Sequence, residues 1–164
     1  MTQPTRKLSR HFRILKATAD WIKVQPLGDI LDSGVTIQKL PFRRNLTYAP
    51  GIYVTPTPES IANRNSGADW ITYRAAVTCV SAPTNQNLTD EDQLNTHLLI
   101  RESLYDALLP LTDEALPGCS DIVATVTIEP GAIFDVSAFN AGYDVQQIIV
   151  ACTGTKLRGT QNAA

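Results

Sequence analysis

The sequence predicts an α+β fold: a two-layer sandwich in which two amphipathic helices cover a mostly antiparallel or mixed sheet. Apolar residues recur with helical spacing in two segments and with alternating spacing in five others, in the order α-β-β-β-α-β-β. Successive strands without a helix between them favour antiparallel or mixed pairing. Two helices that each have one apolar face can cover one side of such a sheet.

The first helix is expected from residue 8 to about residue 22. Its apolar stripe consists of Leu8, Phe12, Leu15, Ala19 and Ile22. Ser9 is a suitable N-cap, and Pro26 with Gly28 ends the helix. The opposite face is basic, and it is either a solvated face or a contact with an acidic partner.

Three strands are expected next, over residues 34–40, 51–56 and 70–80. Pro56 and Pro58 lack a backbone N–H, so they are expected to end the second strand. Residues 58–69 then form a polar loop. The third strand alternates apolar with polar residues, which indicates one buried face and one that is wet or contacted.

The second helix is expected over residues 88–109, with Thr89 as its N-cap and Pro110 after its end. Its stripe consists of Leu94, Leu98, Arg101, Tyr105 and Leu108. Asp90, Glu91 and Asp92 occupy the first turn, where the helix dipole favours acids; a metal site is the alternative. Two closing strands, 121–128 and 143–153, are joined by a long hairpin.

Length and composition indicate one globular domain. The chain has 164 residues, of which 43% are hydrophobic and 18% charged, with a net charge of −2. We expect a domain over residues 8–158, a flexible arm over 1–7 and a flexible tail over 159–164. No apolar run has membrane-spanning length, and the N-terminus lacks the apolar segment of a secretory signal, so a cytosolic protein is expected.

The three cysteines are Cys79, Cys119 and Cys152. An odd number without a CxxC pair disfavours a disulfide framework or a zinc site. Cys79 and Cys152 lie in apolar strands, where a free thiol acts as a small core residue. A catalytic cysteine would need a histidine close in space, and this alternative stays open.

The sequence contains none of the common nucleotide-binding, metalloprotease or serine-hydrolase motifs. Both histidines lie in helices; His11 is expected at the surface and His97 in a half-buried structural position. We therefore predict no enzyme activity, no cofactor and no metal site. Aromatic residues are only 7% and fall singly, which disfavours a nucleic-acid-binding module.

Charge is unevenly distributed along the chain. Residues 1–44 hold nine basic and three acidic side chains, a net charge of +6, which leaves −8 for the remainder. Such asymmetry is typical of nucleic-acid contact, and also of head-to-tail assembly in which unlike surfaces meet.

The element order and one strand motif resemble the tail terminator proteins of long-tailed bacteriophages and the related neck and tail-completion proteins. The motif has the form P-x-I-x-V-x-P, here Pro50-Gly51-Ile52-Tyr53-Val54-Thr55-Pro56. It follows an amphipathic helix and precedes a long strand, a helix opened by acids and two closing strands. The resemblance covers about residues 8–158, and the segments 28–48 and 58–69 depart from it.

The resemblance implies a structural virion protein with the predicted α+β sandwich. In that family a hexameric ring at the head-proximal end of the tail ends tube polymerisation and docks the tail to the head connector. The implied partners are further copies of the chain, the tail-tube protein, the head-side connector or neck protein, and DNA that passes through the lumen without sequence specificity, with no membrane. The implied location is the virion, after assembly in the host cytoplasm.

Two alternatives to a tail terminator remain: a head-to-tail connector, neck or head-completion protein, and, from another class, a nucleic-acid-binding or general interaction module. Two sets of residues are expected to make contacts. Those expected at a neighbouring subunit or at DNA are Arg6, Arg10, Arg13, Lys16, Lys39, Arg43 and Arg44. Those expected in docking loops are Thr57, Pro58, Glu59, Arg64, Asp69, Phe134, Asp135 and Phe139.

Overall fold

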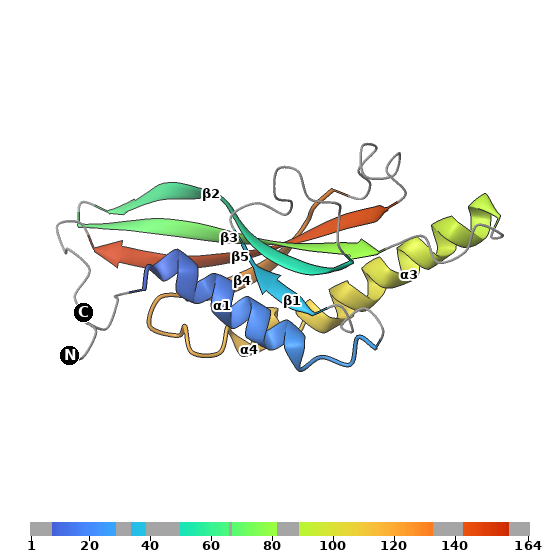
Figure 1. The fold of residues 1–164 in the computed structure, drawn as a ribbon. Helices are drawn as coiled ribbons and strands as arrows, with labels where there is room; N and C mark the ends of the chain where they lie inside the picture. Colours follow the sequence, from blue (N-terminus) through green and yellow to red (C-terminus); the bar gives the residue numbers. More distant parts are fainter. Residues whose placement is uncertain are drawn as a thin grey trace, which may run out of the picture.

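The structure, a computed structural model, describes residues 8–28, 34–38, 50–65, 67–81, 89–132 and 143–157. Its elements are α1 (Arg10–Lys23), β1 (Val35–Ile37), β2 (Gly51–Asn65), β3 (Ala68–Ser81), α3 (Asp90–Leu108), α4 (Leu111–Glu114), β4 (Thr125–Pro130) and β5 (Asp144–Leu157). The predicted α+β class and element order are confirmed, and the short helix α4 is an addition (Figure 1).

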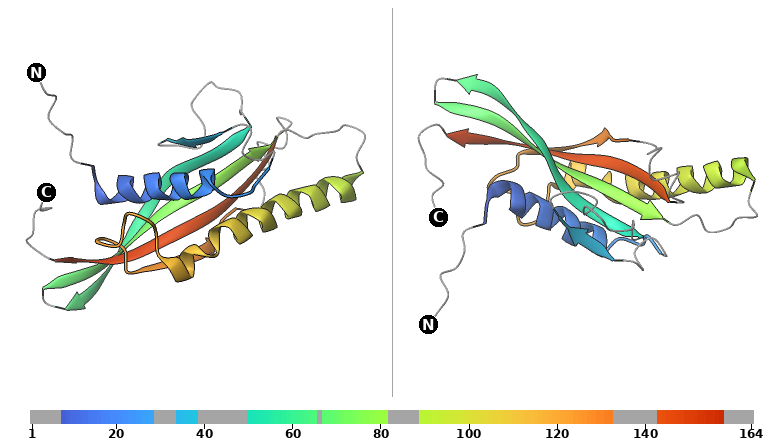
Figure 2. Two further views of the ribbon diagram at one scale, coloured as in Figure 1. Left: turned by 90° about the horizontal axis from the view of Figure 1, so that it is seen from below. Right: turned by 45° about the horizontal axis from the view of Figure 1, so that its top comes forward.

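The strands form one mixed sheet in the order β1-β2-β3-β5-β4. β1 runs parallel to β2, and the other neighbours are antiparallel. The helices lie on one face of this sheet (Figures 1 and 2). The core between the layers contains Ile14 and Ile22 of α1, Leu104 and Leu108 of α3, and alternate residues of the strands, such as Ile148.

The prediction that Pro56 and Pro58 end the second strand is wrong. β2 continues to Asn65, turns, and returns as β3 from Ala68, so the predicted polar loop 58–69 is a long β-hairpin. Pro56 lies opposite Ala75 in the β2–β3 register.

The position of β2 in the sheet explains why the prolines are tolerated. The amide of Ile52 and the carbonyl of Val54 form hydrogen bonds on the side of β2 that faces β1. Because the backbone groups of every second residue in a strand face the same side, the Pro56 nitrogen faces that side too. β1 ends at Ile37, opposite Val54, and at Pro56 no described strand lies on that side. A missing donor there breaks no ladder bond. Pro58 lies within a register shift between Thr57 and Ser60, where a bulge leaves one residue unpaired.

The apolar face of α1 is rotated from the predicted stripe. Leu8 and Phe12 are 48% and 40% exposed, so their prediction as core residues is wrong, whereas Leu15, Ala19 and Ile22 are buried as predicted. Ile14, which the predicted stripe omits, is fully buried. The predicted N-cap is confirmed, because the Ser9 hydroxyl accepts a hydrogen bond from the amide of Phe12.

The stripe of α3 is covered over only part of its length. Arg101 and Leu108 are buried as predicted, but Leu94 and Leu98 are 58% and 40% exposed, so these two predictions are wrong. The reason is position: the N-terminal half of α3 extends past the end of the sheet (Figures 1 and 2). Thr89 caps the helix as predicted by accepting from the amide of Asp92.

The closing strands are shifted from their predicted bounds. Residues 121–124 form a turn, and β4 begins at Thr125; β5 continues to Leu157 and pairs along the whole of β3. Residues 154–157, whose polar composition resembles a tail, thus belong to the sheet. In the described part of the chain, no helix combines the length and hydropathy needed to cross a membrane.

Candidate interaction surfaces

The basic residues of α1 differ in how many hydrogen bonds they make to the rest of the chain and in how exposed they are. The guanidinium of Arg13 donates two 2.8 Å bonds to the Asp121 carboxylate and one of 3.0 Å to the carbonyl of Gly118. This pairing lowers the pKa of Asp121 and raises that of Arg13, chiefly through the hydrogen bond itself. Arg10 donates to the carbonyl of Thr155 at 3.5 Å, whereas Lys16 is exposed. Of these predicted contact residues, Lys16 is the most available to a partner.

A groove of about 580 Å³ runs along the outer flank of α1, and we call it the α1 groove. It is lined by Leu8, Arg13, Lys16, Ala17, Asp20, Trp21, Val24, Pro117, Gly118 and Cys119. Its walls are mostly apolar, and Val24 at its end is 76% exposed. No sequence pattern indicates the groove, because one wall comes from a turn about 100 residues farther along the chain.

The β2–β3 hairpin holds five of the residues predicted for docking loops. Thr57, Pro58, Glu59 and Arg64 lie in β2, and Asp69 lies in β3, so all five belong to strands and the loop prediction is wrong. The far end of the hairpin projects past the start of α1 (Figures 1 and 2). Near that end Ile61 of β2 is 65% exposed. The prolines therefore sit in the strand that forms this projection.

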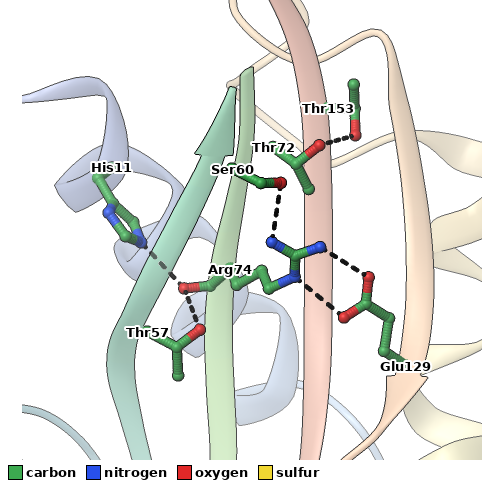
Figure 3. Close-up of polar contacts among 7 residues, drawn as sticks. All are labelled: His11, Thr57, Ser60, Thr72, Arg74, Glu129 and Thr153. Carbon is green, nitrogen blue, oxygen red and sulfur yellow. Dashed lines mark hydrogen bonds and ion pairs between the residues drawn. The ribbon is translucent and has the colours of Figure 1, made fainter. Parts of the chain in front are cut away.

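An ion-pair network crosses the sheet face opposite the helices. Arg74 of β3 extends over β5 and donates to both carboxylate oxygens of Glu129 on β4, at 3.0 and 3.3 Å (Figure 3). Its third nitrogen, Nη1, donates a hydrogen bond to the hydroxyl of Ser60 on β2 at 3.0 Å. Beside it the hydroxyls of Thr72 and Thr153 lie 2.8 Å apart. These contacts tie four strands together at the base of the hairpin.

His11 connects α1 to the same part of β3, from the helix side. Its Nε2 lies 2.9 Å from the carbonyl oxygen of Arg74, so Nε2 carries a proton and donates (Figure 3). Its Nδ1 lies 3.7 Å from the Glu59 carboxylate, and its ring packs on Tyr73. The side chain is only 19% exposed, so the expected surface position of His11 is wrong. The residue anchors the helix to the hairpin.

His97 is more deeply buried than the predicted half-buried position. It is 6% exposed, and its Nδ1 lies 2.6 and 2.7 Å from the two oxygens of Asp144. Gln146 donates to the backbone carbonyl of His97 at 3.2 Å. Nε2 of His97 and Oε1 of Gln146 are buried with no partner among the described residues. The pair fixes the middle of α3 to the start of β5.

All three cysteines are free and buried, as expected for Cys79 and Cys152. Burial, and secondarily the Asp144 charge, raises the pKa of the Cys79 thiol to about 12; burial does the same for Cys152. Both thiols are therefore protonated at neutral pH and poor nucleophiles. Within the described residues no group of three or more His, Cys, Asp or Glu side chains could hold a metal ion.

Several predicted contact residues lie outside the described part of the chain. These are Arg6, Lys39, Arg43, Arg44, Phe134, Asp135 and Phe139. Arg64 lies in β2, and its side chain is not described. Among the rest, the structure brings Thr57 and Glu59 close to His11 and Arg74, and it leaves Lys16 apart on the flank of α1.

No protein-family model matches this chain, and no curated protein matches it significantly.

Proposed function

We propose that this protein is a structural virion component that assembles into a ring at the head-proximal end of a phage tail. In this role it ends tail-tube polymerisation and docks the tail to the head-side connector, and it performs no catalysis. The chain acts in the virion after assembly in the host cytoplasm. DNA passes through the ring without sequence-specific contacts.

One observation carries the proposal: a rigid sandwich with projections at opposite ends. The hairpin end of β2 and β3 extends past α1, and the N-terminal half of α3 extends past the other end of the sheet (Figure 1). Ile61 at one end and Leu94 at the other are 65% and 58% exposed. Exposed apolar side chains on projecting elements are suited to contacts between subunits. The element order that resembles tail terminators supports the same role.

The chemistry of the described residues also favours assembly over catalysis. The polar groups with the closest contacts hold elements of the fold together: Arg74 ties strands, and His97 ties α3 to β5. The α1 groove contains Lys16, Arg13 and Asp20, of which Arg13 is already paired with Asp121.

The mass of the protein in solution tests the proposal. Light scattering on a sizing column is run on the protein alone and with its tail-tube protein. A species of six times 17.9 kDa, seen as a closed ring by electron microscopy, is expected. In a polymerisation assay the ring should cap tubes and stop their growth. A strict monomer that leaves tube growth unchanged would refute the terminator role.

A head-to-tail connector or neck protein is the first alternative, and it would form a ring that binds the head-side connector without stopping tube growth. A nucleic-acid-binding module is the second, favoured by the exposed Lys16 on the basic helix α1. Such a module would bind DNA with an affinity that falls steeply as salt increases. A filter-binding titration at two salt concentrations separates it from the ring.

A further inference from the structure

The apolar stripe of α3 continues past the point where the described residues of its own chain cover it. Leu94 and Leu98 lie four residues apart on the line that continues into Arg101 and Leu108, both of which are buried. Residues 90–96 include no buried position, and the first buried residue of the helix is His97. We call residues 90–98 the α3 arm; of these, His97 is buried. None of the other described residues buries its leucines, so they are open to a surface from outside the subunit.

The charge of the arm restricts what that surface can be. The arm contains three carboxylates, Asp90, Glu91 and Asp92, and no Lys or Arg. An apolar groove with a basic rim is complementary to it, because unlike potentials steer and align partners.

The α1 groove has these properties. Two of the four basic residues of α1, Arg13 and Lys16, line it; Arg13 is paired with Asp121, so Lys16 supplies the exposed cation of the rim. The groove itself joins Trp21, Ala17, Val24 and Pro117 to Lys16, which is exposed. One acid, Asp20, also lines it, and its carboxylate lies 3.2 Å from the ammonium of Lys23.

The arm cannot fill the groove of its own subunit. The C-terminal part of α3 lies beside α1, where the Trp21 indole donates to the carbonyl of Ala107 at 2.8 Å. From there α3 runs away from α1 and out past the sheet, so that its first turn is the part of the helix farthest from α1 (Figures 1 and 2). The two surfaces of one chain are therefore free for two different neighbours.

We propose that the α3 arm of one subunit docks in the α1 groove of the next copy of the chain. Leu94 and Leu98 pack on the groove wall around Trp21 and Val24, and the acids of the first turn lie near Lys16. Because the two surfaces differ, the contact is heterologous and repeats from subunit to subunit, closing a ring if the rotation allows. The inference rests on the proposed ring function and names the contact that builds the ring.

Two variants of the full chain test the contact, each changing only exposed side chains. The arm variant carries Leu94→Ser and Leu98→Ser; the groove variant carries Lys16→Glu and Val24→Glu. We expect each to weaken self-association by about 100-fold or more. The arm variant loses the apolar area of two leucines that the contact would bury, and the groove variant places acids opposite the acids of the arm. The control is Leu109→Ser, which removes a leucine with 54% exposure from the opposite end of α3 and should associate as wild type does.

Mixing the two variants gives the decisive result, read by sedimentation velocity with and without tail-tube protein. The arm variant retains an intact groove and the groove variant an intact arm, so an equimolar mixture should form dimers of twice 17.9 kDa but no larger species. A mixture that stays monomeric while wild type associates would overturn the inference. An arm variant that self-associates as wild type does would also overturn the inference, even if that variant no longer bound the tail tube.

Failure of the ring function gives a different pattern. If wild type associates through the arm but forms open filaments and leaves tube growth unchanged, the contact stands and the terminator role is refuted. If wild type remains monomeric at high concentration and with tube protein, both proposals are refuted. Circular dichroism of each variant confirms that it is folded before its association is compared.

Discussion

Replacing Gly154 with alanine tests how closely the turn after α4 packs on β5. A Cβ added at Gly154 would lie 1.9 Å from the carbonyl oxygen of Ile122 and 2.9 Å from its carbonyl carbon. Both atoms are backbone, so no side-chain rotation relieves the overlap. The turn would have to retreat by about 1.1 Å to reach the 3.0 Å below which real Cβ contacts are essentially not seen.

That retreat has a cost that the structure allows us to estimate. It would break the 2.8 Å hydrogen bond from the amide of Ala124 to the carbonyl of Thr153, worth about 1 kcal/mol. It would also partly unpack Ile122 and Val123, which are 6% and 4% exposed, at about 1 kcal/mol each. We expect Gly154→Ala to lower the free energy of unfolding by roughly 3 kcal/mol, and Tm by about 10 °C.

Guanidinium unfolding followed by circular dichroism measures this loss, with Gly118→Ala as the matched control. Gly118 lies in the same connection between α4 and β4, with φ +74° and open space around the added Cβ, so alanine there should cost only about 1 kcal/mol of backbone strain. If Gly154→Ala is no more destabilising than Gly118→Ala, the close approach of the turn to β5 is refuted. Residues 117–119 of this connection also form one wall of the α1 groove, so the unfolding result bears on that surface too.

Three further predictions concern the edge of β2, the Cys79 thiol and the Arg13–Asp121 ion pair. Pro56→Thr should leave the free energy of unfolding within about 1 kcal/mol of wild type but increase aggregation at high concentration, since it adds a donor on the open edge of β2; Thr55→Pro, whose nitrogen faces β3, should cost at least about 2 kcal/mol. Denaturant midpoints and turbidity measure both, and equal stability of the two variants would contradict the edge assignment. The Cys79 thiol has its folded pKa raised to about 12 from 9.0, so its stabilising contribution is complete below pH 9.0 and is lost as pH rises toward 12. Wild type should therefore lose more stability than Cys79→Ala between pH 8 and about 10.5, and parallel pH profiles would disprove this. The pKa of Asp121 is lowered from 3.8, so its pairing with Arg13 contributes above pH 3.8 and is lost as pH falls further. Asp121→Asn should accordingly lower the denaturant midpoint at pH 7 but not near pH 2, and an equal loss at both would refute the pairing.

The sequence predicted the elements whose signals are local. The Ser9 and Thr89 caps act within three residues, and both are confirmed. The α+β order follows from periodicities of a few residues, and it is also confirmed. For the interaction surfaces, the basic character of α1 was predictable from its composition. Its division into a paired Arg13 and an exposed Lys16 was not, because Asp121 is 108 residues away in the chain.

Three features were decided only by the tertiary structure. A proline ends a strand where a neighbouring strand must hydrogen-bond to its nitrogen, and Pro56 is accepted because no described strand lies on that side of β2. Leu94 continues a genuine apolar stripe, yet it is exposed because the sheet ends before it does. Gly154 lies just past the predicted end of the last strand, but it belongs to β5, and the backbone of a distant turn occupies the place where its side chain would be. Hydrogen bonds and capping contacts within a few residues determine where a helix or strand forms. Whether its residues are buried depends on which segments, distant in the chain, pack against it.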